Sequence, residues 1–135
     1  MSGALDGVVV VDLTTEFWAS LAGALLADFG ARVIRVEDRS QPARDPDRDG
    51  LHPPEAFDSE AQLIHRGKES VGLQLEAEAG NRALRELLAC ADVLLTDFSE
   101  ARLAEWGLSA DAVLAERPEF IYAVGSLAGP LGPES

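Results

Sequence analysis

Apolar runs alternate with helix-like stretches along most of the chain. The first run, Val8–Leu13, is continuous and rich in β-branched residues, which is typical of a strand buried on both faces of a sheet. The next stretch, Phe17–Phe29, carries large apolar residues at helical spacing and is followed by Gly30, a residue that often ends a helix. The run Ala31–Glu37 predicts a second strand. Together these segments predict a strand–helix–strand unit of the kind found in nucleotide-binding folds.

The second half of the chain continues the alternation. Ser70–Leu75 alternates polar and apolar residues as a strand does, and the leucines that follow it fall on one face of a helix. Further strands and short helices are expected in the order Asp92–Thr96, Glu100–Trp106, Ala110–Ala115 and Phe120–Val124. This order predicts an α/β protein with a mainly parallel sheet covered by helices on both faces. Because Val8–Leu13 is apolar on both sides, we expect it near the centre of that sheet.

Length and local composition predict one domain with one long loop. A chain of 135 residues can bury a single core, so we expect one domain over residues 1–135. Residues 38–60 hold four prolines and ten charged residues and show no apolar period. We therefore expect residues 38–60 to form a long, charged, proline-rich loop that is mobile in the absence of partners.

Composition narrows the classes of partner and site. The 11 basic and 24 acidic residues give a net charge of −13, which would repel nucleic acid and anionic membranes. No apolar run reaches the roughly 18 residues of a membrane span and no secretory signal is visible, so we expect a cytoplasmic protein. Cys90 is the single cysteine, and its place on the apolar side of a predicted helix predicts a buried thiol. His52 and His65 lack ligand spacing, so we expect no metal site.

Two turns carry the candidate chemistry. After the first strand, Thr14 or Thr15 can cap the following helix. No glycine lies between Gly7 and Gly23, which argues against a dinucleotide held by a glycine-rich loop. The run His65–Lys68 places two cations around a glycine just before a strand. Such a run either binds phosphate through its charges and a bare amide or forms a solvated turn, and the residues alone leave both open.

These segments together resemble the class III CoA-transferase family, which includes formyl-CoA transferase, carnitine CoA-transferase and α-methylacyl-CoA racemase. The opening motifs of the family are similar to Val9–Thr14 and to LLADFGARVIRVE, Leu25–Glu37. Its later motifs are similar to IHRGKESVGLQL, ADVLLTDF and the stretch that ends in FIY, which are Ile64–Leu75, Ala91–Phe98 and Arg117–Tyr122. The resemblance runs nearly end to end. It implies a Rossmann-like three-layer fold that corresponds to part of the family's large domain.

The resemblance also implies a function. The domain would form part of the CoA-binding groove of a protein that transfers CoA between carboxylic acids, with coenzyme A or acyl-CoA as substrate and no tightly bound cofactor. The implied contacts lie in three turns and comprise Thr15, Glu16, Phe17, His65, Arg66, Gly67, Lys68, Asp97 and Phe98. The family's nucleophile is an aspartate whose position lies beyond the C terminus of this chain. We therefore assign no catalytic residue and expect this chain alone to transfer no CoA.

Several positions depart from the family pattern. Acidic residues stand where the family often has arginine or asparagine, namely Asp38, Glu69, Asp97 and Glu105. Each arginine-to-acid exchange disfavours a nearby phosphate by about 1 kcal/mol or more. Arg66 and Lys68 are then the expected phosphate-facing cations.

The departures also support an alternative. The domain would then be a non-catalytic scaffold or partner subunit that uses the same fold for protein association. Family members are longer and form homodimers, so the resemblance implies self-association or a partner chain that supplies the rest of the fold. The chain itself would be a fragment, a split subunit or a degenerate relative.

Overall fold

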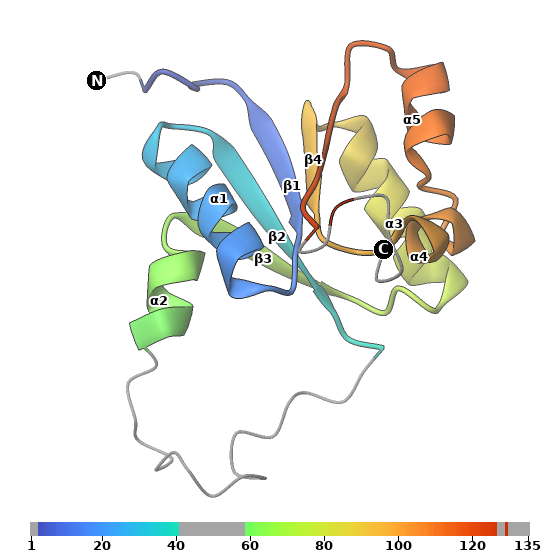
Figure 1. The fold of residues 1–135 in the computed structure, drawn as a ribbon, viewed down its shortest axis with the longest axis horizontal. Coiled ribbons are helices and arrows are strands. Elements are labelled where there is room, and N and C mark those ends of the chain that lie inside the picture. The colour runs from blue at the N-terminus through green and yellow to red at the C-terminus, as the bar shows by residue number, and fades with distance from the viewer. Residues whose placement is uncertain (1–2, 41–58, 127–128, 130–135) are drawn as a thin grey trace, which may run out of the picture.

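A parallel sheet organises the molecule. The structure, a computed structural model, describes residues 3–40, 59–126 and 129. In these residues the sheet has five strands in the order β3-β2-β1-β4-β5, and every pairing is parallel. The strands in chain order are β1 (Val9–Leu13), β2 (Arg32–Asp38), β3 (Lys68–Leu73), β4 (Val93–Thr96) and β5 (Ile121–Val124). The first strand lies at the centre, as its unbroken apolar run predicts (Figure 1).

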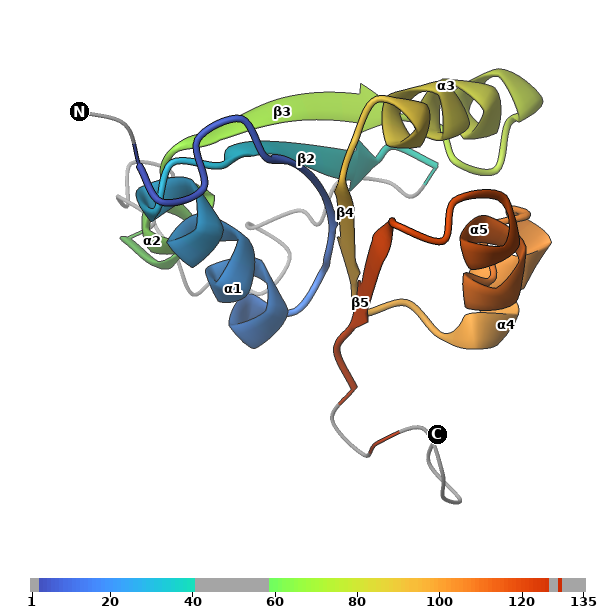
Figure 2. The same ribbon diagram turned by 90° about the horizontal axis from the view of Figure 1, so that it is seen from above.

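Helices cover both faces of the sheet, so the predicted three-layer α/β fold is confirmed. One face carries α1 (Phe17–Asp28) and α2 (Ser59–His65), which pack against each other. Figure 2 shows α3 (Glu78–Ala89), α4 (Glu100–Glu105) and α5 (Ala110–Glu116) on the other side of β4 and β5. The strand order and the alternation of strand and helix are those of a Rossmann-like half.

The connection after β2 differs from the sequence-based expectation at both ends. Asp38 is the last residue of β2, and residues 59 and 60, the last two of the expected loop, begin α2 (Ser59–His65). A seven-residue helix is too short to show a clear apolar period, and such a helix depends on packing against a neighbour, here α1. The rest of the expected loop, residues 41–58, lies outside the described residues.

The hydrophobic core is larger on one face of the sheet than on the other. Val11 and Leu13 of β1 face a large cluster that includes Leu84, Leu94 and Trp106. The opposite face of β1 is thinner: Val10 packs with Ala31, Val33 and Val93. A central strand that is apolar on both sides is what parallel sheets require, because helices exclude water from each face.

Helix α1 does not bury the large apolar residues that make it recognisable in the sequence. It buries Ala19, Ser20, Gly23 and Ala24. Four large apolar residues of the helix and its C-cap have side chains that are 38% to 58% exposed, namely Phe17, Trp18, Leu25 and Phe29. Small residues let the helix backbone approach the sheet closely, so these four bulky side chains stay exposed, whereas Leu26 is partly buried against the core.

The expectation of a buried thiol at Cys90 is wrong. Cys90 is exposed and forms the C-cap of α3. It follows the buried Leu88 by two residues, which is about 200° around a helix, so it points away from the core.

Replacing Val10 by aspartate should lower the free energy of unfolding by roughly 3 kcal/mol or more, because it buries a carboxylate without a partner. Val10 is 1% exposed, whereas Ile121 on the edge strand is 59% exposed. Ile121→Asp is therefore the matched control and should cost less than about 1 kcal/mol in urea denaturation. Equal losses in the two variants would contradict the central burial of β1.

Candidate functional site

A groove lies at the carboxyl ends of β1 and β2. Its volume is about 600 Å³, within the range of small-molecule sites. It is lined by Leu13, Thr14, Thr15, Glu16, Ser20, Arg35, Val36, Glu37, Asp38, Arg39, Ile64, His65 and Phe98. The loops that leave β1 and β4 lead to helices on opposite faces of the sheet, and open α/β sheets bind ligands at such a point. The groove is therefore the candidate functional site.

The loop after β1 is held by a carboxylate from the next strand. Asp97, directly after β4, accepts hydrogen bonds from the Thr15 and Glu16 backbone N–H groups at 2.8 and 2.7 Å. Helix α1 has no side-chain cap and no acidic residue in its first turn, so Asp97 provides the negative charge at its N terminus. The prediction that Thr14 or Thr15 caps the helix is wrong.

Thr14 belongs instead to a buried polar network below the groove. The Lys68 ammonium lies 2.5 Å from an Asp12 carboxylate oxygen and 2.7 Å from the Ser20 carbonyl oxygen. The side chains of Lys68 and Asp12 are 1% and 0% exposed. The Thr14 hydroxyl donates to Asp12 at 2.5 Å and shares a hydrogen bond with the Ser20 hydroxyl at 2.7 Å. Lys68 thus faces a buried carboxylate, not the groove.

Gly23 is the residue of α1 that makes room for this network. A Cβ at this position would lie 2.4 Å from an Asp12 carboxylate oxygen and 2.9 Å from the Lys68 Nζ. Both distances are far below van der Waals contact. The ion pair and the close approach of α1 to the sheet therefore require glycine here.

The turn before β3 lies mostly at the opposite edge of the sheet. The Arg66 guanidinium bonds the Asp28 carboxylate at 2.5 Å, where α1 ends, and donates to the Leu63 carbonyl oxygen. Gly67 has a φ of +72°, and a Cβ there would lie 3.2 Å from Ala27 at the end of the same helix. Since α1 ends just before β2 begins, Arg66 and Gly67 lie at the amino edge.

The implied contact residues are therefore divided in space. Thr15, Glu16, His65 and Phe98 line the groove. Asp97 binds the loop at its rim, and Phe17 opens α1. Arg66, Gly67 and Lys68 lie elsewhere, and the part that each residue plays in CoA binding stays a prediction.

Two arginines that line the groove are absent from the sequence-based set. The Glu37 carboxylate bonds Arg35, lies 2.8 Å from an Arg39 guanidinium nitrogen and accepts from the Ser70 hydroxyl at 2.7 Å. The Ser70 hydrogen bond, together with the two arginines, lowers the pKa of Glu37. Residues two apart in an extended segment share a face, and Arg39 directly follows β2, so the spacing of Arg35, Glu37 and Arg39 is the signal that indicates this cluster.

His65 is a neutral polar group of the groove. Burial lowers the pKa of its imidazole, and the positive charges of Arg35 and Lys68 act in the same direction. Its Nδ1 atom is buried and has no hydrogen-bond partner in the described structure. At neutral pH the imidazole therefore offers a polar contact without a charge.

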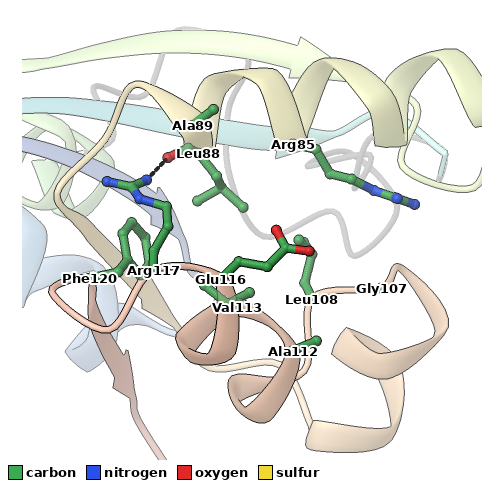
Figure 3. Close-up of a pocket in the computed structure, with 10 residues that line it drawn as sticks. All are labelled: Arg85, Leu88, Ala89, Gly107, Leu108, Ala112, Val113, Glu116, Arg117 and Phe120. Carbon is green, nitrogen blue, oxygen red and sulfur yellow. Dashed lines mark hydrogen bonds between the residues drawn. The ribbon is translucent and has the colours of Figure 1, made fainter.

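A smaller cavity of about 200 Å³ lies between α3 and α5 (Figure 3). Arg117 lies at its side, donates to the carbonyl oxygens of Leu88 and Ala91 at 2.7 and 2.8 Å, and stacks over Phe120. Arg117 thus satisfies carbonyl groups at the end of α3. The cavity contains none of the contact residues expected from the sequence.

The part of the chain that the structure describes contains neither a metal-ligating cluster nor a membrane-spanning helix. No three His, Cys, Asp or Glu residues there are grouped so as to hold a metal ion. No helix among those residues combines the length and apolar character needed to cross a membrane.

Comparison with known proteins gives the family. The family model described as CoA-transferase family III matches residues 5–135. The chain belongs to CoA-transferase family III. Its relatives include the cinnamoyl-CoA:phenyllactate CoA-transferase of Clostridium sporogenes, which is 32% identical over 134 residues, covering 96% of this chain and 32% of that protein. The succinate–glutarate CoA-transferase of Agrobacterium fabrum is 34% identical over 137 residues, covering 96% of this chain and 34% of that protein.

Solved structures of the family agree with the fold. The structure of Rv3272 from Mycobacterium tuberculosis has a TM-score of 0.76 and 30% identity, covering 98% of this chain and 36% of that one. A CAIB/BAIF family protein from Brucella suis has a TM-score of 0.73 and 31% identity, covering 92% and 33%. The chain thus spans about a third of the length of these relatives. The resemblance to the family and its Rossmann-like fold are confirmed.

Breaking the buried Asp12–Lys68 pair should strongly destabilise the protein. Lys68→Met leaves a buried carboxylate unpaired and should lower the free energy of unfolding by about 3–5 kcal/mol, and Asp12→Asn/Lys68→Met should recover much of that loss. The control is Glu69→Gln, which breaks the Arg32–Glu69 pair whose side chains are 60% and 57% exposed. That control should cost less than about 1 kcal/mol. Equal costs for Lys68→Met and Glu69→Gln in urea denaturation would contradict the role of the buried pair.

His65 should make stability depend on pH below neutrality. Its pKa is lowered in the folded protein, so the unfolded chain binds a proton first as the pH falls through the ordinary value of 6.5. The wild type should therefore lose more stability than His65→Gln between about pH 7.5 and pH 5. His52 is present in both proteins and cancels in the difference. Parallel curves of unfolding free energy against pH would contradict the burial of a neutral imidazole.

Proposed function

We propose that this chain forms part of the CoA-binding groove of a protein that transfers CoA between carboxylic acids. The observation that carries the proposal is the groove at the carboxyl edge of β1 and β2, which gathers residues from three separate family motifs: Thr15 and Glu16, His65, and Phe98. The relatives from Clostridium sporogenes and Agrobacterium fabrum are named as CoA-transferases that act on carboxylic acids. The family of these relatives and the position of the groove both support CoA as the ligand.

The lining of the groove suits a long, amide-bearing ligand. Leu13, Val36, Ile64 and Phe98 supply apolar wall, and the neutral His65 supplies a polar contact. Arg39, whose side chain is 59% exposed, lies at the rim, 2.8 Å from the Glu37 carboxylate that balances its charge. Asp97 and Lys68 would act as positioning residues, because each holds the loop after β1 or the residues below it.

The transfer step itself would use a nucleophilic carboxylate, and we assign that role to no residue of this chain. In that step a carboxylate oxygen attacks the thioester carbonyl, the CoA thiolate leaves, and a mixed anhydride forms. The chain spans about a third of its relatives, so we propose that the nucleophile comes from the rest of the family fold. That part would be supplied by self-association or by a partner chain, in the cytoplasm.

A second candidate function is protein association by a non-catalytic scaffold. The observation that favours it is the exposure of large apolar side chains on one face of the molecule. Phe17, Trp18, Leu25 and Phe29 lie on or beside α1, and Leu63 of the adjacent α2 is 46% exposed. Exposed apolar side chains gathered in this way are typical of interaction surfaces.

Titration of CoA by calorimetry tests the first function. We expect weak binding, near −5 kcal/mol, because acidic residues surround the groove. Arg39→Ala should weaken CoA binding by about fivefold, since it leaves the Glu37 carboxylate less balanced at the rim and so adds net negative charge near the phosphates of the ligand. Arg82→Ala removes an exposed cation from α3 and should leave the affinity unchanged.

Arg66→Ala extends the same test to the amino edge of the sheet. A loss of affinity in Arg66→Ala but not in Arg39→Ala would show that CoA lies along the turn before β3 and not in the groove. Absence of CoA binding by the folded wild type would contradict CoA handling by this chain and favour the association scaffold.

A further inference from the structure

The groups of the groove that are able to bind an anion are already occupied by the chain itself. These groups are the backbone N–H groups of Thr15 and Glu16 and the guanidinium groups of Arg35 and Arg39. Asp97 takes the first set and Glu37 takes the second. The two carboxylates come from the ends of β4 and β2, the strands on either side of β1.

Asp97 fills the position at the start of α1 where an anionic group is most favourable. One of its oxygens accepts from both backbone N–H groups, at 2.8 and 2.7 Å, and the other lies 3.0 Å from the Thr15 nitrogen. Backbone N–H groups before a helix attract phosphate through their direction and the helix dipole. A phosphate at this point would have to displace the Asp97 carboxylate.

Glu37 occupies the arginine pair in the same way. It lies between Arg35 and Arg39 and accepts a third hydrogen bond from Ser70. Carboxylate and phosphate compete for the same guanidinium donors. An anion that approaches Arg39 therefore meets a cation whose charge is already balanced.

The excess of carboxylates over guanidinium groups in the groove favours an uncharged segment of the ligand. Glu16, Glu37, Asp38 and the rim residue Asp97 give four carboxylates against the two guanidinium groups. The walls between them are apolar and His65 is neutral. Such a groove repels phosphate and accepts a neutral chain with amide groups.

We propose that Asp97 and Glu37 are specificity-determining residues that act as internal competitors of phosphate, so that the groove takes the uncharged pantetheine arm of its ligand. The naming of pantetheine rests on the proposed function, whereas the exclusion of phosphate does not. Phosphate groups of the same ligand would lie outside the groove. Removing the two negative charges should therefore create an anion site that the wild type lacks.

The test uses inorganic pyrophosphate, which needs no assumption about CoA. Glu37→Gln/Asp97→Asn keeps an acceptor oxygen at each position and removes both charges. Pyrophosphate should bind this variant at least about tenfold more tightly than the wild type, while the affinity for pantetheine should change by less than about twofold. Glu86→Gln/Asp111→Asn changes two exposed acids on α3 and α5, matches the net charge and should leave both affinities unchanged.

Each outcome decides the proposal. A folded double variant that binds pyrophosphate no better than the control overturns it, and so does an equal gain for pantetheine. Thermal melting checks the fold, and if the double variant does not fold, Glu37→Gln and Asp97→Asn are measured singly. The proposal is then overturned if neither single variant binds pyrophosphate more tightly than the control does. Failure of wild-type CoA binding, measured separately, concerns the proposed function alone.

Discussion

The buried ion pair between Asp12 and Lys68 is the constraint on which the arrangement around the groove depends. It joins the central strand to the start of β3 across the intervening β2. Two buried charges are tolerated only when they are paired and their remaining bonding positions are filled, and Thr14 and Ser20 fill them here. The pair also requires a close approach of α1, which only Gly23 permits at that point.

This constraint explains an unusual property of α1. Because the helix backbone lies close to the sheet, its inner face is made of alanine, serine and glycine. Phe17, Trp18, Leu25 and Phe29 stay exposed and, with Leu63 of α2, form an exposed apolar surface. None of these exposed residues lines the groove, so the apolar surface and the groove are separate parts of the described structure.

The position of the groove in the sheet favours ligand binding, but its charged groups disfavour the binding of phosphate. It lies where the loops of β1 and β4 part, which is the usual ligand position in an open parallel sheet. Yet its amide groups and its arginines are satisfied by Asp97 and Glu37, so it has little left to offer a phosphate. The same carboxylates that hold the loop and order the arginines therefore limit the class of ligand that enters.

The sequence by itself determined the elements, their order and the family. Unbroken β-branched runs and helical spacing are local properties, so β1, α1, α3 and the central place of β1 were predictable from Val8–Leu13 and the segments that follow. The family motifs likewise indicated Thr15, His65 and Phe98, which the structure brings to one groove.

Only the tertiary structure decided which charges are available. Lys68 and Arg66 are alike in the sequence, but one is enclosed with Asp12 and the other pairs with Asp28 at the far edge of the sheet. The exposure of Cys90, the helix α2 and the Arg35–Glu37–Arg39 cluster were decided in the same way. Whether a charged side chain is free or paired depends on residues that are distant in the chain. The local sequence pattern does not show which distant residues come into contact.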